Sequence, residues 1–469
     1  MSISSSLYSG ISGLDTLGNS MAVIGDNIAN VNTTAFKSSR ASFEDLLSQK
    51  LWVASGTAQI GRGVRMSTVS ADFSQGSFEN TDQATDLAVG GNGFFIVSNR
   101  DTADRYYTRA GQFTFDKDGY LVNPQGLVVQ GWQLDPTTNE DVGDITNIVL
   151  ANFSSPPAAT NLVQMTTNLD SRTPVETVNS DLQANWNANN DPPIGSTLYD
   201  YQTSINIYDS LGSQHTITLY FDRTTNPNEY EFLVTSPPSD DSDAAAKGAM
   251  AGAYMHGVIT FDNNGNMSGY SNLTLKDPAD AATWNAFNPA TDVGTNGYPE
   301  FQVDFNQPQL VELNLGLFYN GGAWSPDASY RGTQYATAAT TTNASQDGYG
   351  PGTLQNVAVD SNGVMTGHYS NGQITPLYRV ALANFNNPLD LTKNGGNLYQ
   401  QNQRTGDPST GHPGTNGLGS IASNSLEQSN VDLADQFVKM IVTERGFQAN
   451  SRIITTTDDM LQELINLKR

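Results

Sequence analysis

Apolar residues recur every seven residues at both ends of the chain. Near the start, one series is Leu7, Leu14, Met21 and Ile28, and a second is Leu17, Ile24 and Val31. Near the end, the series is Leu426, Leu433, Met440, Phe447, Ile454 and Leu461, with Phe437 and Ile465 at a companion position. This spacing predicts two α-helices, each with an apolar seam of the kind that pairs helices in coiled coils.

Both predicted helices carry boundary signals. The first pattern stops near NIANVNTTAF, where asparagines and β-branched residues disfavour a helix. For the second helix, Ser429 and Asp432 fit a capping box, and Lys468 and Arg469 favour the C-terminal end. A single apolar stripe ordinarily marks a helix packed on its own core. Two seams at opposite ends of one chain instead favour helices that pair with each other and with other subunits.

Neither terminal helix is expected to be stable alone. Burial of one seam gains less free energy than the ordering of the helix costs in backbone entropy. Pairing of the two helices still leaves large residues in water, among them Tyr8, Ile11, Val438 and Ile441. We therefore expect the terminal segments to become ordered when neighbouring subunits cover their apolar stripes.

Residues 70 to 425 show a different pattern, with short apolar or alternating runs separated by Gly, Asn, Asp and Pro. The runs GFFIV, GLVVQGWQL, SINIYDS, HTITLYF, YEFLV and FQVDF predict strands. The stretches FDKDGY, FDNNGN and VDSNGV place Asn or Asp before Gly, which predicts hairpin turns. They lack the acidic ligands and the final Glu of a calcium loop. The predicted fold class is α+β, with mainly-β domains nested between long helical ends.

Charge locates a boundary inside the β region. The 469 residues include 22 Lys plus Arg and 47 Asp plus Glu, for a net charge of -25. Residues 146–350 hold 5 of the basic and 21 of the acidic residues, so this segment is expected to be the most solvated. The predicted domains are a helical domain at 1–31 and 426–469, a linker at 32–69, a discontinuous β domain at 70–145 and 351–425, and an acidic outer β domain of one or two subdomains at 146–350. The acidic excess argues against binding of nucleic acid or anionic membranes.

Residues suited to catalysis or metal binding form no pattern along the sequence. The chain has no cysteine, which excludes disulfides and thiol nucleophiles. His215, His256, His368 and His412 stand apart, without the spacing of a metal site or a catalytic base. The glycine-rich GGNGFFIV precedes a strand and not a helix, so we interpret it as a turn and not as a phosphate loop. We therefore expect no enzyme activity and no cofactor.

Several motifs resemble those of the bacterial flagellar rod and hook axial proteins. SLYSGISGL, DNIANVNTTAFK and FSQGSFENTDQATDLAVGGNGFFIV are similar to sequences that rod and hook proteins share. YDSLGSQHTITLYFD, FNNPLDLTKNGGNLY, GHPGTNGLGSI and the terminal FQANSRIITTTDDMLQELINLKR are similar to the hook protein family in particular. The resemblance covers residues 1–150 and 350–469, and in the acidic middle only residues 208–222. The motif residues that it identifies are Asn27, Asn30, Asn32, Thr33, Phe36 and Lys37.

Two positions depart from the family pattern. Ala35 stands where the family usually has Gly, which argues against a positive φ at this position. Thr85 stands where a larger apolar residue is common.

The resemblance implies a structural subunit that polymerises helically into a curved tube, a universal joint between rod and filament. The implied partners are further copies of the chain, the hook cap protein, the distal rod protein, the hook-filament junction protein and the flagellar type III export apparatus. The implied location is the extracellular hook. Export without a cleaved signal agrees with a start that lacks a basic and apolar signal segment, and nothing later approaches the roughly 20 apolar residues of a membrane span.

The seam residues of the two helices are the predicted polymerisation interface. They are Leu7, Leu14, Leu17, Met21, Ile24, Ile28, Val31, Leu433, Phe437, Met440, Phe447, Ile454, Leu461 and Ile465. Two alternatives stay open. A distal rod or hook-junction protein would share the helical ends but form a short straight tube or a ring. A secreted β-rich adhesin would need an aromatic cluster, whereas Trp186, Trp284 and Trp324 are scattered through the acidic segment.

Overall fold

The computed structural model describes residues 3–53, 56–100, 102, 104–150, 153–175, 181–277 and 283–466. The chain divides into two compact units, which are described separately here. Unit 1 comprises Met1–Phe153, Leu354–Tyr369 and Gln373–Arg469. Unit 2 comprises Ser154–Thr353 and Ser370–Gly372. The sequence predicts the acidic segment at 146–350, close to the extent of unit 2.

Unit 1 combines two long helices with a β domain. The helices are α1 (Ile3–Ala29) and α4 (Leu433–Asn466). The strands in the first part of the chain are β1 (Ser39–Asp45), β2 (Gln49–Val53), β3 (Gly56–Ile60), β4 (Val64–Ala71), β5 (Phe78–Asn80), β6 (Leu87–Gly90), β7 (Phe94–Ser98), β8 (Arg105–Thr108), β9 (Thr114–Phe115), β10 (Leu121–Val122), β11 (Val128–Leu134) and β12 (Asp141–Asn147). The later elements are β26 (Gly352–Val359), β27 (Val364–Tyr369), β28 (Ile374–Val380), β29 (Leu382–Asn384), the 3-10 helix η3 (Pro388–Asp390), β30 (Thr392–Lys393), β31 (Leu398–Gln400), β32 (Ser409–Gly411), β33 (Ser420–Ser423) and β34 (Ser425–Glu427). Among the helices of the described residues, none has both the length and the apolarity that a membrane span requires.

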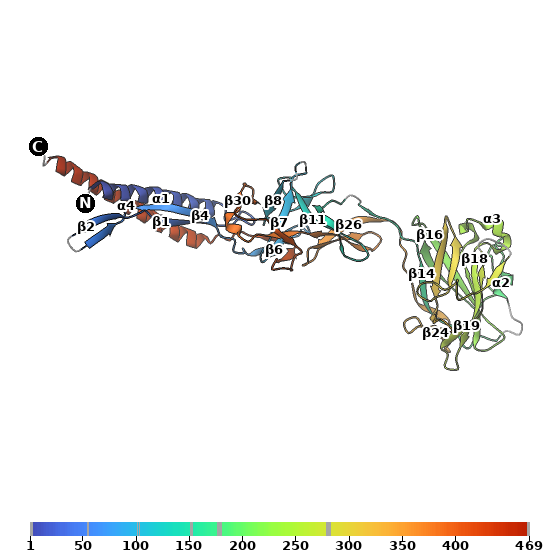
Figure 1. The fold of residues 1–469 in the computed structure, drawn as a ribbon. Coiled ribbons are helices and arrows are strands. Elements are labelled where there is room, and N and C mark those ends of the chain that lie inside the picture. Colours follow the sequence, from blue (N-terminus) through green and yellow to red (C-terminus); the bar gives the residue numbers. More distant parts are fainter. Residues whose placement is uncertain are drawn as a thin grey trace. The chain divides into compact units, whose positions relative to one another are not determined.

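The main sheet of unit 1 joins the two parts of the chain. Its order is β26-β27-β28-β11-β7-β8-β31-β30, so β11 and β7 from the first part lie between strands from the second part (Figure 1). Two short ladders continue this pairing toward α4, β33 with β6 and β34 with β5. Strand β7 reads FFIVS and is buried along its length, with Phe95 and Val97 in one apolar cluster and Phe94 and Ile96 in another. A strand that is apolar on both faces is expected at the centre of a covered sheet.

The predicted linker at 32–69 is corrected in part, because four strands lie between Ser39 and Ala71. Strands β1 and β4 pair antiparallel, and β2 pairs with β3 between them. The ribbon lies beside α1, where the backbone N–H of Val64 donates to the hydroxyl of Ser12 at 3.3 Å (Figure 1). The sequences SRASFED and VRMSTVSA are too polar to predict strands by themselves. Packing against the helix accounts for the ribbon better than intrinsic strand propensity does.

The predicted start of the second helix is also wrong. Leu426 lies in β34, and α4 begins at Leu433. The carboxylate of Asp432 accepts the N–H of Ala434 at 2.8 Å and that of Asp435 at 3.3 Å, so Asp432 caps the helix. Ser429 instead accepts the N–H of Val431 at 3.3 Å, outside the helix. Lys468 and Arg469 lie outside the described residues.

Unit 2 packs two sheets around one core. Its elements are β13 (Ser154–Ser155), β14 (Leu162–Asn168), α2 (Leu182–Asn185), β15 (Tyr201–Tyr208), β16 (Gln214–Arg223), β17 (Glu229–Thr235), η1 (Pro238–Asp240), α3 (Ala244–Lys247), η2 (Gly248–Met250), β18 (Ala253–Phe261), β19 (Met267–Lys276), β20 (Trp284–Ala286), β21 (Glu300–Asp304), β22 (Pro308–Asn314), β23 (Leu317–Tyr319), β24 (Trp324–Pro326) and β25 (Thr340–Gln346). One sheet runs β15-β16-β17-β18-β19-β20 and the other β21-β22-β14-β25. Both sheets supply a single apolar cluster, which includes Phe221 and Phe232 from the first and Val163 and Phe301 from the second.

One turn recurs at the hairpins of both units and confirms the predicted turns. An aspartate carboxylate accepts the N–H groups two and four residues further on, and a glycine with positive φ stands between the two donors. The carboxylates are those of Asp116, Asp209, Asp262 and Asp360. The glycines are Gly119, Gly212, Gly265 and Gly363, with φ between 76° and 83°. The predicted strands are confirmed as well, from GFFIV in β7 to FQVDF in β21.

Candidate assembly surface and its anchor

Helices α1 and α4 pack side by side and run antiparallel (Figure 1). Near the end of α1, the amide of Asn27 donates to the side-chain oxygen of Gln436 at 3.2 Å. Near the start of α1, Gly10 lies against Ile454. Contacts therefore move toward the start of one helix as they move toward the end of the other.

The contact between the helices uses small and polar residues. A Cβ atom on Gly13 would stand 2.8 Å from the side-chain nitrogen of Asn450, so the helices approach closely here. The most buried positions of α4 are Gln436, Thr443 and Thr457. The two threonine hydroxyls donate to carbonyl groups of their own helix. The contact also includes apolar residues, with Leu17 against Gly446.

Three large apolar residues of α4 remain largely exposed to solvent in the single chain. Phe437 is 50% exposed, Phe447 44% and Ile465 68%. Of the fourteen predicted interface residues, Ile24 alone is buried in the single chain. Leu433, Phe437, Phe447 and Ile465 are exposed, and the others are half-buried: Leu7, Leu14, Leu17, Met21, Ile28, Val31, Met440, Ile454 and Leu461.

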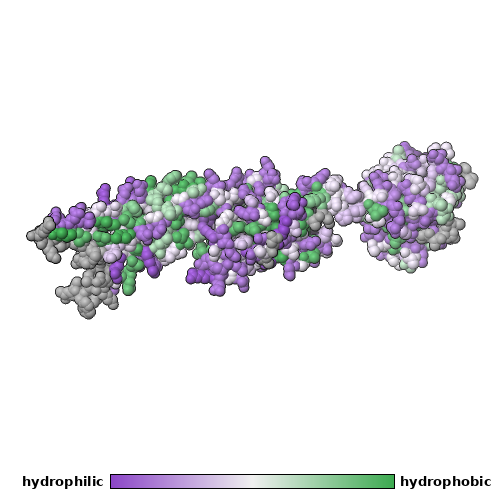
Figure 2. Space-filling model, turned by 90° about the horizontal axis from the view of Figure 1, so that it is seen from above, coloured by the Kyte–Doolittle hydropathy of each residue, from purple (hydrophilic) through white to green (hydrophobic). Residues whose placement is uncertain are grey.

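Further exposed apolar residues on the same helices lie outside the predicted seams. They are Tyr8, Ile11, Val438, Ile441, Val442, Ile453 and Met460. Figure 2 shows hydrophobic residues in green along the helical part of unit 1. We define the outer apolar face as these seven residues together with Leu433, Phe437, Phe447 and Ile465. Large exposed apolar patches are uncommon on monomeric soluble proteins.

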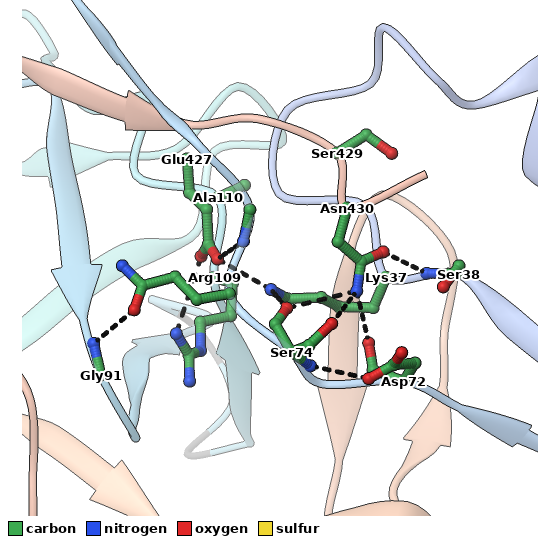
Figure 3. Close-up of polar contacts among 12 residues, drawn as sticks. Lys37, Ser38, Asp72, Ser74, Gly91, Arg109, Ala110, Glu427, Ser429 and Asn430 are labelled. Atoms are coloured by element: carbon green, nitrogen blue, oxygen red, sulfur yellow. Dashed lines mark hydrogen bonds and ion pairs between the residues drawn. The ribbon is translucent and has the colours of Figure 1, made fainter. Parts of the chain in front are cut away.

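A buried ion pair anchors the start of the β ribbon to the segment that enters α4. The side chains of Lys37 and Glu427 are both fully buried, and the ammonium lies 2.8 Å from the carboxylate (Figure 3). Lys37 also donates to the carbonyl of Ser74 at 2.6 Å, and the N–H of Gly76 donates to Glu427 at 2.9 Å. Arg109 lies 3.6 Å from the second carboxylate oxygen. Burial lowers the pKa of Lys37, and its hydrogen bond with Glu427 opposes this shift.

The other motif residues hold the turn between α1 and β1. Asn27 accepts the N–H of Ser39 at 2.8 Å and donates to its carbonyl at 2.9 Å, which ties the helix to the first residue of β1. Thr33 donates to the side-chain oxygen of Asn30 at 3.1 Å. The ammonium of Lys393 lies 5.6 Å from the ring centre of Phe36. Asn32 is exposed.

The structure contradicts the expectation that Ala35 does not adopt a positive φ. Its φ is 56°, in the left-handed region that disfavours residues with a Cβ atom. The residue is fully buried, and its N–H donates to the carbonyl of Glu427 at 2.7 Å. The surrounding contacts therefore hold alanine in a conformation that glycine would adopt with less strain, by about 1 kcal/mol.

Sequence reasoning missed the partners of the motif. Glu427 pairs with Lys37, Asn430 accepts the N–H of Ser38 at 2.8 Å, and Arg109 lies beside Glu427 (Figure 3). A single sequence carries no signal that pairs residues several hundred positions apart. A charged residue inside an otherwise polar motif, such as Lys37, was the one indication that a buried partner exists.

The interpretation of the histidines as isolated is wrong in space for three of the four. His215 lies 3.5 Å from Asp209 and 3.2 Å from Asp240, and His412 lies 2.6 Å from Asp141. His256 lies 2.6 Å from Glu231. These partners come from other strands or turns, so spacing along the chain could not reveal them.

Four models of flagellar domains match successive parts of the chain. They are the Flagella basal body rod protein at residues 7–37, the Flagellar hook protein FlgE/F/G D1 domain at 88–166, the Flagellar basal body protein FlaE D2 domain at 168–349 and the Flagellar basal body rod FlgEFG protein C-terminal at 422–467. The chain is 36% identical over 485 residues to the flagellar hook protein FlgE of Borreliella burgdorferi, covering 99% of both chains. It is 31% identical over 461 residues to FlgE of Escherichia coli, covering 98% of both. A solved structure, the flagellar hook protein FlgE2 of Helicobacter pylori, superposes with a TM-score of 0.45 at 16% identity, covering 75% of this chain and all of that one.

Proposed function

The chain belongs to the family of the flagellar hook protein FlgE, as a structural subunit of the bacterial flagellar hook, and from this premise we propose that its outer apolar face drives helical polymerisation. In the proposed polymer, neighbouring copies cover this face, and the subunits form a curved, flexible tube that transmits torque from rod to filament. The contacts between copies are heterologous, so they repeat without closing into a ring.

The observation that carries the proposal is the arrangement of the helix pair. Small and polar residues such as Gly13 and Thr443 occupy the contact between α1 and α4, while Phe437 and Phe447 face solvent. A pair of helices that functions alone would place its largest apolar residues in the shared contact. The arrangement here supports the use of that surface between subunits, with the predicted seam residues among those that become buried.

The ion pair between Lys37 and Glu427 supports the proposal that the subunits transmit torque. Lys37 follows α1, and Glu427 precedes α4, so their ion pair joins both helical ends to the β domain of unit 1. Breaking a buried pair of this kind is costly, because one charge is left without its partner. The helices and the β domain of unit 1 are thereby proposed to move as one body when the tube turns.

Family membership is the support for the proposed partners. They are the hook cap protein, the distal rod protein, the hook-filament junction protein and the flagellar type III export apparatus, with the assembled hook outside the cell. We propose export without removal of a signal segment. No nucleic acid, membrane or cofactor enters this proposal.

Assembly of the purified chain tests the proposal. Electron microscopy of the wild-type chain is expected to show curved tubes. Phe447→Asp should abolish tubes, because it places an unpaired charge in the subunit contact. Ala449→Asp is the matched control, since it adds the same charge at an exposed position two residues further along the helix, and it should still assemble. Straight short tubes or single rings from the wild type would favour a rod or junction protein, and equal assembly of both variants would contradict the role of the outer apolar face.

A further inference from the structure

Three potential metal ligands meet where α2 (Leu182–Asn185) lies against the central strands β17 and β18 of unit 2. Glu231 lies on β17, His256 lies on the adjacent strand β18, and Asp181 stands immediately before α2. One ligand atom from each residue lies within 4.8 Å of the other two. The Nε2 atom of His256 is 2.6 Å from Oε1 of Glu231. The three residues are separated along the sequence, and the fold brings them together.

Each ligand also contacts a group outside the cluster, and the N–H donor to Glu231 shares the oxygen Oε1 with His256. The N–H of Leu182 donates to the Glu231 carboxylate at 2.9 Å. Asp181 accepts the N–H of Ala184 at 3.0 Å through Oδ1, as the N-cap of α2. The Nδ1 atom of His256 faces the hydroxyl of Thr274 at 3.5 Å, which leaves Nε2 directed toward the carboxylates. Such outer contacts orient the ligands of metal sites in proteins.

The charge of the cluster is not balanced by lysine or arginine. Glu231 is buried, and the carboxylate of Asp181 lies close to it. Among the described residues, no lysine or arginine forms an ion pair with either carboxylate. Two carboxylates at this separation repel each other. A divalent cation would neutralise both carboxylates and use the imidazole as a neutral ligand.

The other half-buried histidine of unit 2, His215, shows the contrast. His215 also contacts two aspartates, but it uses a different ring nitrogen for each. Its ring stacks on Phe305, with centroids 3.9 Å apart. A single ion cannot bind both nitrogens of one ring, so His215 bridges carboxylates and does not form a ligand set. His215 and His256 have the same side-chain exposure, 13%, which makes His215 a matched control.

We propose that Asp181, Glu231 and His256 bind one divalent transition-metal ion, with Zn²⁺ as the expected ion. One imidazole nitrogen and two carboxylate oxygens suit Zn²⁺, and water would complete the coordination. Ca²⁺ and Mg²⁺ prefer sets made of oxygen alone. The ion would fasten the start of α2 to strands β17 and β18 and so stabilise unit 2.

Binding is tested on the full chain, prepared without a histidine tag and treated with a chelator that is then removed. Calorimetric titration should show one saturable Zn²⁺ site per chain and no comparable site for Ca²⁺ or Mg²⁺. His256→Gln, Glu231→Gln and Asp181→Asn should each weaken Zn²⁺ binding at least tenfold. Asp181→Asn is a mild change, because asparagine also caps helices. His215→Gln should bind Zn²⁺ as the wild type does.

Two further measurements keep the proposal falsifiable if a variant folds poorly. Zn²⁺ should raise the melting temperature of the wild type and of His215→Gln. It should not raise that of a variant that combines the substitutions at Asp181, Glu231 and His256. X-ray absorption of the Zn²⁺-loaded wild type should report one imidazole nitrogen together with oxygen ligands. Absence of a saturable Zn²⁺ site in the wild type, or equal binding by His256→Gln, would overturn the proposal. An absorption spectrum with oxygen ligands alone would overturn it as well.

Discussion

The ammonium of Lys37 and the carboxylate of Glu427 lie 2.8 Å apart, although 390 residues separate them along the chain. Lys37→Met should therefore destabilise unit 1 by about 3–5 kcal/mol, because Glu427 would keep only the more distant Arg109 as a charged partner. Urea unfolding followed by fluorescence and circular dichroism measures this loss.

A matched control for Lys37 is available on α4. Lys439 pairs with Asp435 at 2.6 Å, but both side chains are 53% exposed. Lys439→Met should change the free energy of unfolding by less than about 0.5 kcal/mol. Equal effects of the two substitutions would show that the buried pair does not anchor the β domain to the helices.

Two glycines of α1 should respond in opposite ways to alanine. Gly18 has open space around it, so Gly18→Ala should stabilise the helix by up to about 1 kcal/mol. Gly13→Ala gains the same propensity, but its Cβ atom would meet the side-chain amide of Asn450 at 2.8 Å and displace it from its hydrogen bond with the carbonyl of Gly446. Thermal melting of the monomer, followed by circular dichroism at 222 nm, compares the two. Equal stabilisation by both would contradict the close pairing of α1 with α4.

Unit 2 is expected to fold without the rest of the chain. Its two sheets share one apolar cluster, which includes Phe221, Phe232 and Phe301. A fragment of residues 154–353 should therefore melt in one cooperative transition and resist limited proteolysis. A gradual melt with rapid cleavage inside the fragment would contradict the independence of this unit.

Asp170 of unit 2 should titrate at unusually low pH. Hydrogen bonds from the Arg172 side chain, together with its N–H, lower the pKa of Asp170 from 3.8 to about 2. Because the folded-state pKa is depressed, the stabilisation is present above pH 3.8 and is lost as the pH falls toward 2. NMR titration should show the pKa of Asp170 rising in Arg172→Gln. The pKa of Asp135, which the N–H groups of Thr137 and Thr138 lower, should stay unchanged. An unshifted Asp170 in the variant would contradict the role of Arg172.

Local chemistry made the hairpins and helices predictable. Turns such as that at Asp262 depend on one carboxylate and one glycine within five residues. All the residues that determine such a turn are therefore visible in a short stretch of sequence. The seven-residue periodicity likewise identified α1 and α4 as helices. It identified the face along which they pair only in part, since Ile454 lies against Gly10 and Leu17 against Gly446, but the pattern also places Phe447 in the seam. Here Gly13 permits the close approach, and Phe447 faces outward.

Features that depend on contacts between distant parts of the chain could not be predicted from the sequence. The β1–β4 ribbon is polar and depends on α1 for its packing, which led to its interpretation as a linker. The partners of Lys37 and the carboxylate beside His256 come from strands whose positions follow from the tertiary fold. Their recognition required coordinates, since neither pair has a local spacing.

Oxidative footprinting by hydroxyl radicals, read by mass spectrometry, tests most directly whether the outer apolar face lies between subunits. Phe437 and Phe447 are about half exposed in the single chain and should be oxidised readily in the monomer. In the assembled tube their oxidation should fall at least several-fold, because neighbouring copies exclude water from them. Phe95, which is buried in the β domain of unit 1, should be protected in both states. Equal oxidation of Phe437 and Phe447 in monomer and tube would contradict the proposed assembly.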